Sequence, residues 1–252
     1  VEVLRGPAAA SIFGTEAAGG VIQIFTKRGT GDRQRFDFRS EYGLSSTPAS
    51  WWEATPHGSW FHDRYVRQGH ERSHYLSVRG GTDRFDYYVG ASLNTGKGVL
   101  PQNTNDYWSF RANMKATPSQ SVAIGVTTAF SLRKIGLPYD GSSEFGITRN
   151  GLLGGELGVR VPPEEVLLYE LGLKASRFSA GATLENVVRP NLRHRLSVGA
   201  DIFNTDNIDH TPYGTQVIEG GKKISYRRHA TTLTLDYLAT LGYALSESVG
   251  AE

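Results

Sequence analysis

One short run of the sequence carries residue types that could perform hydrolytic chemistry. His70-Glu71-Arg72-Ser73-His74 matches the H-E-x-x-H pattern, in which two histidines bind zinc and the glutamate acts as general base. That chemistry requires a helix, because only there do positions i and i+4 lie close enough on one face to share an ion. On a strand the two histidines would lie about 13 Å apart. The alternating residues that follow His74 favour a strand, so a zinc peptidase is kept only as a remote alternative.

The composition excludes several other classes of protein. The 252 residues include no Cys, which excludes thiolate metal sites and cysteine nucleophiles. The net charge is +2 with Arg scattered along the chain, so no basic block for nucleic acid is present. No Walker, dinucleotide or G-x-S-x-G pattern occurs. We therefore expect no enzymatic activity, no cofactor, no metal site and no nucleic-acid partner.

Alternation with a period of two residues dominates the chain from about Arg33 onward and predicts β-strands. In Arg35 to Tyr42 every even position except Ser40 is aromatic and every odd position is charged. We expect eight strands, mostly of roughly 9 to 13 residues, a length typical of strands that cross hydrocarbon rather than of soluble sandwiches. The alternating residues that mark these strands lie within 35–42, 76–78, 84–93, 108–114, 122–132, 178–184, 196–202 and 233–241.

The expected connections alternate between short and long. Tight turns are predicted at 80–83, 116–120, 189–192 and 244–248, and long loops at 44–73, 94–105, 133–175 and 204–227. An up-and-down meander with its long loops at one end is typical of outer-membrane barrels, whose turns are periplasmic and loops extracellular. Helical signal is confined to 8–13 and to 162–165, where prolines could open a turn of helix.

The first 29 residues depart from this alternation. They read as a short strand, a Gly-Pro turn, an Ala-rich helical turn, a Gly-Gly reversal and a second apolar strand. The run closely resembles the end of the plug domain of TonB-dependent outer-membrane receptors, in which V-L-R-G-P, a small-residue helix with [Y/F]-G, and G-G-V-I-x-I-x-T-K lead into the first barrel strand. The motif residues in this sequence are Arg5, Gly6, Pro7, Gly14, Gly19 and Gly20. The ending Lys27-Arg28-Gly29 and the later strands at 177–178 and 235–237 look most like the SusC/RagA-like branch.

The resemblance implies an all-β fold, with an N-terminal α/β plug remnant followed by antiparallel up-and-down transmembrane β-barrel strands. Residues 1–29 would be the C-terminal part of the plug domain, and residues 30–252 the first part of an incomplete barrel. The complete barrel would have about 22 strands, since a barrel of that size encloses a plug. We therefore expect the chain to be an internal fragment.

The resemblance also implies a function. It is TonB-dependent active import of a bulky nutrient across the bacterial outer membrane, with an oligosaccharide or peptide favoured over a siderophore or cobalamin. The implied partners are a TonB-type energy-transducing inner-membrane complex, a SusD-like surface lipoprotein, outer-membrane lipid and the nutrient ligand. A passive porin or adhesin barrel is the alternative; it would share the strands but lack the plug segment.

Two groups of residues are candidates for binding. Trp51, Trp52 and Trp60 in the first long loop, and Tyr139 in a later one, could stack against sugars or aromatic chelates. An interfacial girdle or packing within the loops is the alternative for these aromatic residues, and it is favoured. By resemblance, Arg5 would face the barrel wall and pair with lumen carboxylates such as those of Glu41, Asp86 and Asp201.

Overall fold

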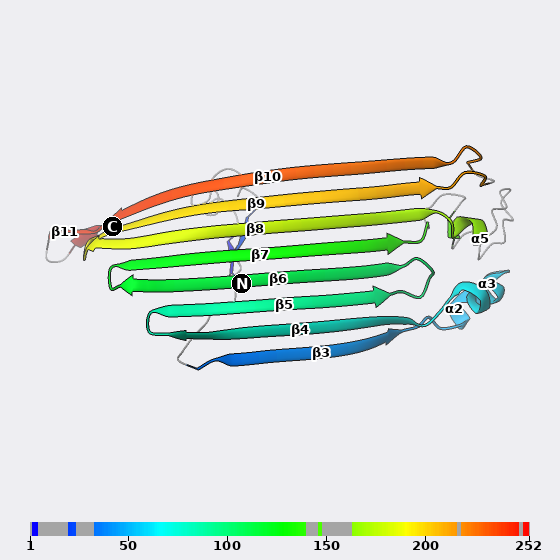
Figure 1. Ribbon diagram of the computed structural model, residues 1–252, viewed down its shortest axis with the longest axis horizontal. Coiled ribbons are helices and arrows are strands. Elements are labelled where there is room, and N and C mark those ends of the chain that lie inside the picture. Colours follow the sequence, from blue (N-terminus) through cyan, green and yellow to red (C-terminus); the bar gives the residue numbers. More distant parts are fainter. Residues whose placement is uncertain are drawn as a thin grey trace.

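Eight long strands form one antiparallel sheet in which every neighbour in sequence is a neighbour in space (Figure 1). The computed structural model describes residues 2–4, 20–23, 33–139, 146–147, 163–215, 218–246 and 249–251. The order β10-β9-β8-β7-β6-β5-β4-β3 is the up-and-down meander expected from the alternation, so the predicted fold class is confirmed. The strands are β3 (Arg35–Ser45), β4 (Gly69–Thr82), β5 (Phe85–Lys97), β6 (Thr104–Ser119), β7 (Val122–Leu137), β8 (Glu170–Arg189), β9 (Leu192–Thr211) and β10 (Lys222–Leu241).

Two short antiparallel pairs stand apart from this sheet. β1 (Glu2–Leu4) pairs with β2 (Val21–Gln23), and β11 (Tyr243–Ser246) pairs with β12 (Val249–Ala251). Gly20, which precedes β2, has a φ of 105°, a conformation that favours glycine. The strand, glycine and strand expected in the first 29 residues are therefore present where the structure describes them. The boundary between plug and barrel at residues 29 and 30 lies outside the described residues and stays a prediction.

Several strands are longer than the alternation indicates. β8, β9 and β10 each have 20 residues, and the ladders of β9 and β10 continue at the loop end into segments that are largely polar on both faces. β9 runs on to Thr211 and β10 starts at Lys222, so the loop expected over 204–227 is shortened to the residues between them. Hydropathy does not mark such strand ends, since neither face changes from polar to apolar there.

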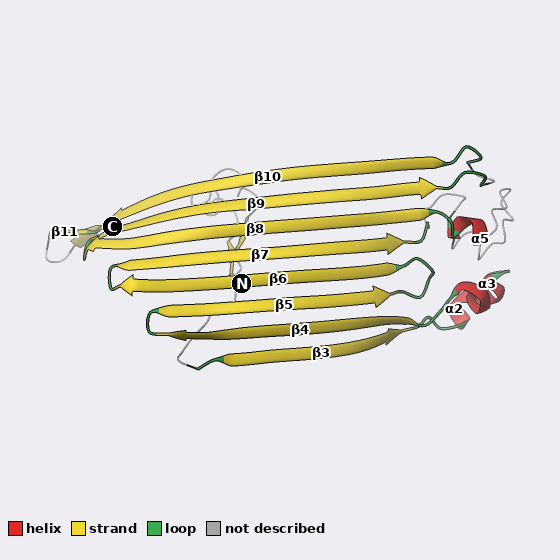
Figure 2. Ribbon diagram, in the orientation of Figure 1, coloured by secondary structure: helices red, strands yellow, loops and turns green. Residues whose placement is uncertain are grey.

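The helices lie at one end of the sheet, opposite the tight turns (Figure 2). Of the two predicted helical segments, 162–165 is confirmed as α5 (Pro163–Val166), whereas 8–13 lies outside the described residues. The prediction that helical signal is confined to these two segments is wrong, because α2 (Ser50–Glu53) and α3 (Gly58–Tyr65) occupy the first long loop. Both are short, and α3 buries only Gly58 and Phe61, so too few turns exist to set up a visible period. No helix within the described ranges has the length and apolar character needed to cross a membrane.

Strand register sorts the side chains onto two faces of contrasting chemistry. Phe110, Phe130 and Phe178 are direct neighbours on adjacent strands and define what we call the apolar face. The opposite, polar face carries ion pairs, among them Arg177 with Asp201 at 2.8 Å. Each of the three phenylalanines is more than 40% exposed, so the apolar face lacks cover from the described chain. A continuous apolar sheet face of this kind requires an apolar partner, and lipid is the one that barrel walls use.

Candidate functional site

A small hydrophobic core lies outside the sheet, among the connections at its helical end. This loop core consists of Trp52, Phe61, Ile147, Val166 and Tyr169, contributed by the β3–β4 and β7–β8 connections. Phe61 and Ile147 are fully buried, and the Trp52 and Phe61 rings pack with centroids 5.5 Å apart. Residues far apart in sequence are thus held together at the end of the sheet that carries the long loops.

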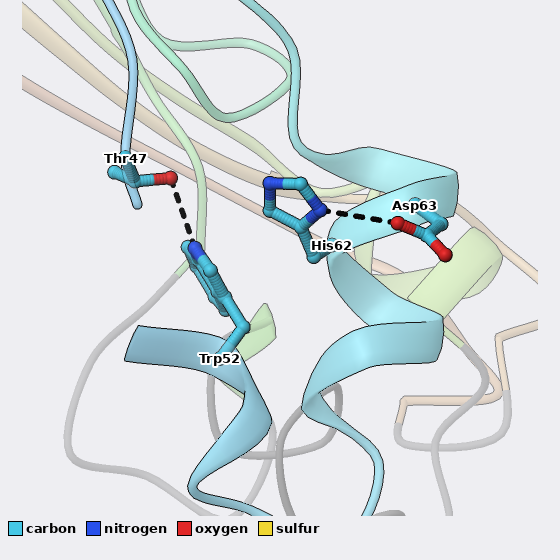
Figure 3. Close-up of polar contacts among 4 residues, drawn as sticks. All are labelled: Thr47, Trp52, His62 and Asp63. Atoms are coloured by element: carbon cyan, nitrogen blue, oxygen red, sulfur yellow. Dashed lines mark hydrogen bonds and ion pairs between the residues drawn. The ribbon is translucent and has the colours of Figure 1, made fainter. Parts of the chain in front are cut away.

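Figure 3 shows how α2 and α3 are held in the first loop. The indole Nε1 of Trp52 donates a hydrogen bond of 2.9 Å to the hydroxyl of Thr47, on the segment that leaves β3. On α3, His62 Nδ1 lies 3.2 Å from the carboxylate of the adjacent Asp63. Trp52 therefore keeps its one polar atom bonded while its rings fill the loop core, as buried tryptophans generally do.

Polar contacts fasten three of the connections to one another. The guanidinium of Arg64 lies 3.5 Å from the carboxylate of Glu164, and the hydroxyl of Tyr65 donates to the same carboxylate. Arg67 donates to the carbonyl of Gly98, at 3.1 Å, and so ties the β3–β4 connection to the β5–β6 connection. These contacts join the β3–β4, β5–β6 and β7–β8 connections, so the three loops form one structural unit.

Three titratable groups in these loops have shifted pKa values. The hydrogen bond from Tyr65 lowers the pKa of the Glu164 carboxyl, whereas burial raises the pKa of Tyr65. Burial also raises the pKa of Tyr169 to about 12. All three shifts move titration away from neutral pH, so Glu164 stays charged and both tyrosines stay protonated. That arrangement serves stable hydrogen bonds rather than proton transfer.

The four aromatic residues predicted to bind ligand fall into two groups. Trp52 is buried in the loop core, and Tyr139 packs edge-on against Tyr169 with ring centroids 5.4 Å apart. Trp51 and Trp60 are 69% and 48% exposed. The structure thus brings Trp52 and Tyr139 into the packing of the loops and leaves Trp51 and Trp60 on the surface. A role for any of them in ligand binding stays a prediction.

The H-E-x-x-H run lies within β4, so the expectation that it is a strand is confirmed. His74 is hydrogen-bonded to Ser40 at 3.0 Å, and the ring of His70 stacks on that of Tyr42 at 6.5 Å. Each histidine therefore has its own partner on β3. Among the described residues, no group of three or more His, Asp or Glu is placed to hold a metal ion.

The polar face carries a hollow that the sequence analysis did not single out. Its lining includes Tyr75, Tyr88 and Tyr107 together with Arg111 and Arg177. The hydroxyls of Tyr75 and Tyr88 lie 2.8 Å apart and are hydrogen-bonded. The sequence carries a signal for this hollow, because alternation assigns these tyrosines to the polar face, where their aromatic rings stand out among small and charged side chains. Hydroxyl and guanidinium groups in one hollow can bind the carbonyls and carboxylates of a ligand.

The residues predicted to seat the plug are only partly placed. Arg5, Gly6, Pro7, Gly14 and Gly19 lie outside the described residues. Their three expected carboxylate partners all belong to the polar face by register, and one of them is already paired with an arginine of the neighbouring strand. These partners are Glu41, Asp86 and Asp201.

An antiparallel meander with one apolar face, one polar face and loops gathered at one end defines a class, the wall of a transmembrane β-barrel. Comparison with known proteins narrows that class. The chain is 24% identical over 178 residues to TonB-dependent receptor P3 of Formosa agariphila, a match that covers 63% of the chain and 17% of that protein. No protein-family model matches the chain.

Solved structures show the same fold. The RagAB peptide importer in its "open-open" state superposes with a TM-score of 0.73 at 15% identity, and the RagAB peptide transporter with 0.71 at 16% identity. Each superposition covers 97% of the chain and 36% of the solved chain, so this chain spans about a third of that length. The resemblance to TonB-dependent receptors, with RagA-like proteins as structural neighbours, is thereby confirmed, and with it the bacterial outer membrane as the location.

Proposed function

We propose that this chain forms part of the wall and plug of a TonB-dependent transporter, which imports a bulky nutrient through the outer membrane. The observation that carries the proposal is the sorting of side chains by register. Lipid would cover the apolar face, and the polar face, with its arginines, tyrosines and ion pairs, would line the lumen. A plugged lumen blocks passive flow, so import needs energy delivered through the plug.

The plug-like segment over 1–29 favours this proposal over a passive porin or adhesin. A passive barrel would share the strands but lack a segment with this motif. The zinc peptidase has little support, because its motif lies on a strand and each of its histidines is engaged by a different residue of β3.

A peptide is the nutrient we favour, with an oligosaccharide second. The structural neighbours are named peptide importers, and the hollow on the polar face offers groups suited to peptide carbonyls and carboxylates. We further propose that a surface lipoprotein covers the loop end. The packed loop core would hold the loops in place beneath this lipoprotein, and the exposed side chains of Trp51 and Trp60 would contact it.

The experiment is an uptake assay in a strain that lacks the full-length protein and in the same strain complemented with it. Radiolabelled peptide, oligosaccharide and ferric siderophore pools are supplied separately, with and without a protonophore that collapses the inner-membrane gradient. We expect complementation to restore peptide uptake and the protonophore to abolish the restored part. Restored uptake that is insensitive to the protonophore would identify a passive pore, and no restored uptake of any of the three pools would contradict the proposal.

A further inference from the structure

The apolar face changes character abruptly at the loop end. Register places Arg72, Lys134, Lys174 and Arg227 in a single row across β4, β7, β8 and β10, and Lys97 one row further out. These five residues, which we call the basic collar, are all exposed. They share the face that carries the phenylalanines, so the collar borders the apolar surface directly.

The charges of the collar are incompletely compensated within the described chain. Lys134 and Lys174 are direct cross-strand partners, an arrangement that is destabilising for like charges. Neither lysine forms an ion pair with another described residue. The same row also holds two carboxylates: Asp106 is the cross-strand partner of Lys134, and Asp206 is the partner of Lys174 and is engaged by Arg227 at 3.4 Å. The row therefore holds four cations against two carboxylates, and an anionic partner outside the chain would offset both this excess and the repulsion between the facing lysines.

The opposite end of the same face carries no such charge. At the level of the tight turns, a row of direct partners runs across β4 to β10 without a Lys, Arg, Asp or Glu: Thr82, Phe85, Ala116, Ile124, Leu184, Leu196 and Tyr237. Simple solvation of strand ends would place charges at both ends. The cations therefore distinguish one membrane boundary from the other.

The spacing between the two rows fits a bilayer. From Lys134 to Ile124 on β7 is about ten residues, or about 33 Å of strand. Strands tilted by about 45° would bring this close to the height of the lipid-facing band of outer-membrane barrels, about 25 Å. Trp108 lies one row inside the collar, where barrels place their aromatic girdle. The collar therefore lies at headgroup level.

We propose that the basic collar binds the phosphorylated headgroups of lipids in the outer leaflet, whose acyl chains cover the apolar face below. This inference rests on the proposed function, because it requires the apolar face to be the outer wall of a barrel. Lysine and arginine are strong donors to phosphate oxygens, and a lysine pair held apart by its own repulsion can bridge one phosphate group. The anion would offset the repulsion that the chain leaves in place.

The test uses the full-length protein purified in zwitterionic detergent and measures binding of fluorescent bis-phosphorylated lipid A. The variant Lys134→Gln/Lys174→Gln should bind about tenfold more weakly or worse, since each basic side chain near an anionic surface contributes on the order of 1 kcal/mol. Lys134→Arg/Lys174→Arg should restore binding. The matched control is Arg111→Gln/Lys115→Gln, which removes two cations from the polar face of β6 and should leave binding unchanged.

Three further arms separate the alternatives. Dephosphorylated lipid A should bind the unaltered protein as weakly as phosphorylated lipid binds the glutamine variant; equal binding of both lipids would overturn the inference. Competition by inorganic phosphate at the concentration of the lipid would indicate a free-anion site and overturn it as well. Loss of self-association rather than of lipid binding in the glutamine variant would assign the collar to contact between copies. If the protein inserts into membranes but its lipid A binding depends neither on the phosphates nor on the two lysines, only the inference about the basic collar is contradicted. Failure to insert would contradict the proposed function.

Discussion

Replacing Phe130 by Arg should destabilise the membrane-inserted protein by about 2–4 kcal/mol, the cost of a cation on the lipid face near the bilayer midplane. Phe130 lies between the basic collar and the tight-turn end, with Phe110 and Phe178 beside it in register. The charge would have to leave water for hydrocarbon or drag headgroups inward. Urea unfolding in lipid vesicles, followed by the loss of the compact band on unheated gels, measures the change.

The control is Ser131→Arg, one residue along the same strand. Its side chain belongs to the polar face and borders the hollow that contains Arg111 and Arg177. We expect it to change the free energy of unfolding by less than about 1 kcal/mol, since the lumen of a barrel is wet. Equal destabilisation by both substitutions would mean that β7 does not separate lipid from water.

Phe61→Ala should open the loop core. The side chain is fully buried against Trp52 and Tyr65, and removing a buried phenylalanine costs about 3–5 kcal/mol through lost burial and a residual cavity. A core of so few residues cannot absorb that loss, so α2, α3 and α5 should separate while the sheet remains. Hydrogen exchange of the loop amides measures this local opening, because the strand amides serve as an internal reference.

Trp60→Ala supplies the comparison within the same helix. Trp60 is half exposed, and its ring contacts with the described residues are an edge-on contact with Tyr65 and a cation–π contact with Arg64 at 5.9 Å. Its removal should leave loop exchange nearly unchanged. Similar exchange in the two variants would show that the loops are not organised around Phe61.

The strands and their faces could be predicted from the sequence, because a single physical rule produces both. Alternation such as that of Arg35 to Tyr42 appears where one face of a strand meets an apolar environment and the other meets water, so periodicity reveals both the strand and its two faces. The tight turns follow from the gaps between alternating runs. Eight strands in meander order were therefore predictable from one chain.

The strand ends and the loop core could not be predicted, because their causes are not local. The extension of β9 to Thr211 depends on pairing with a partner strand that begins at Lys222. Ile147 and Val166 lie nearly twenty residues apart and are buried by Phe61 and Trp52 from another loop, so nothing in either segment alone marks them as core. Trp52 was predicted as a candidate for stacking against a ligand, yet its burial against Phe61 is set by that same distant packing.

For the basic collar, the sequence shows the charged residues but does not show that they are neighbours across the strands. Lys134 and Lys174 are separated by a long connection and become neighbours only through the register of β7 and β8. Register is set by the whole ladder, so a row of charges across several strands has no signature in any one of them.

The central claim, that the apolar face meets lipid and the polar face meets the lumen, is tested most directly by a cysteine scan of β7. These 252 residues contain no Cys, so single cysteines can be placed one at a time from Ile124 to Arg133 and spin-labelled in the full-length protein in vesicles, after any cysteine outside this segment has been replaced by Ser. Even positions should be accessible to oxygen dissolved in the bilayer, and odd positions to a water-soluble nickel reagent, in strict alternation. Uniform accessibility to the water-soluble reagent along the strand would contradict the claim.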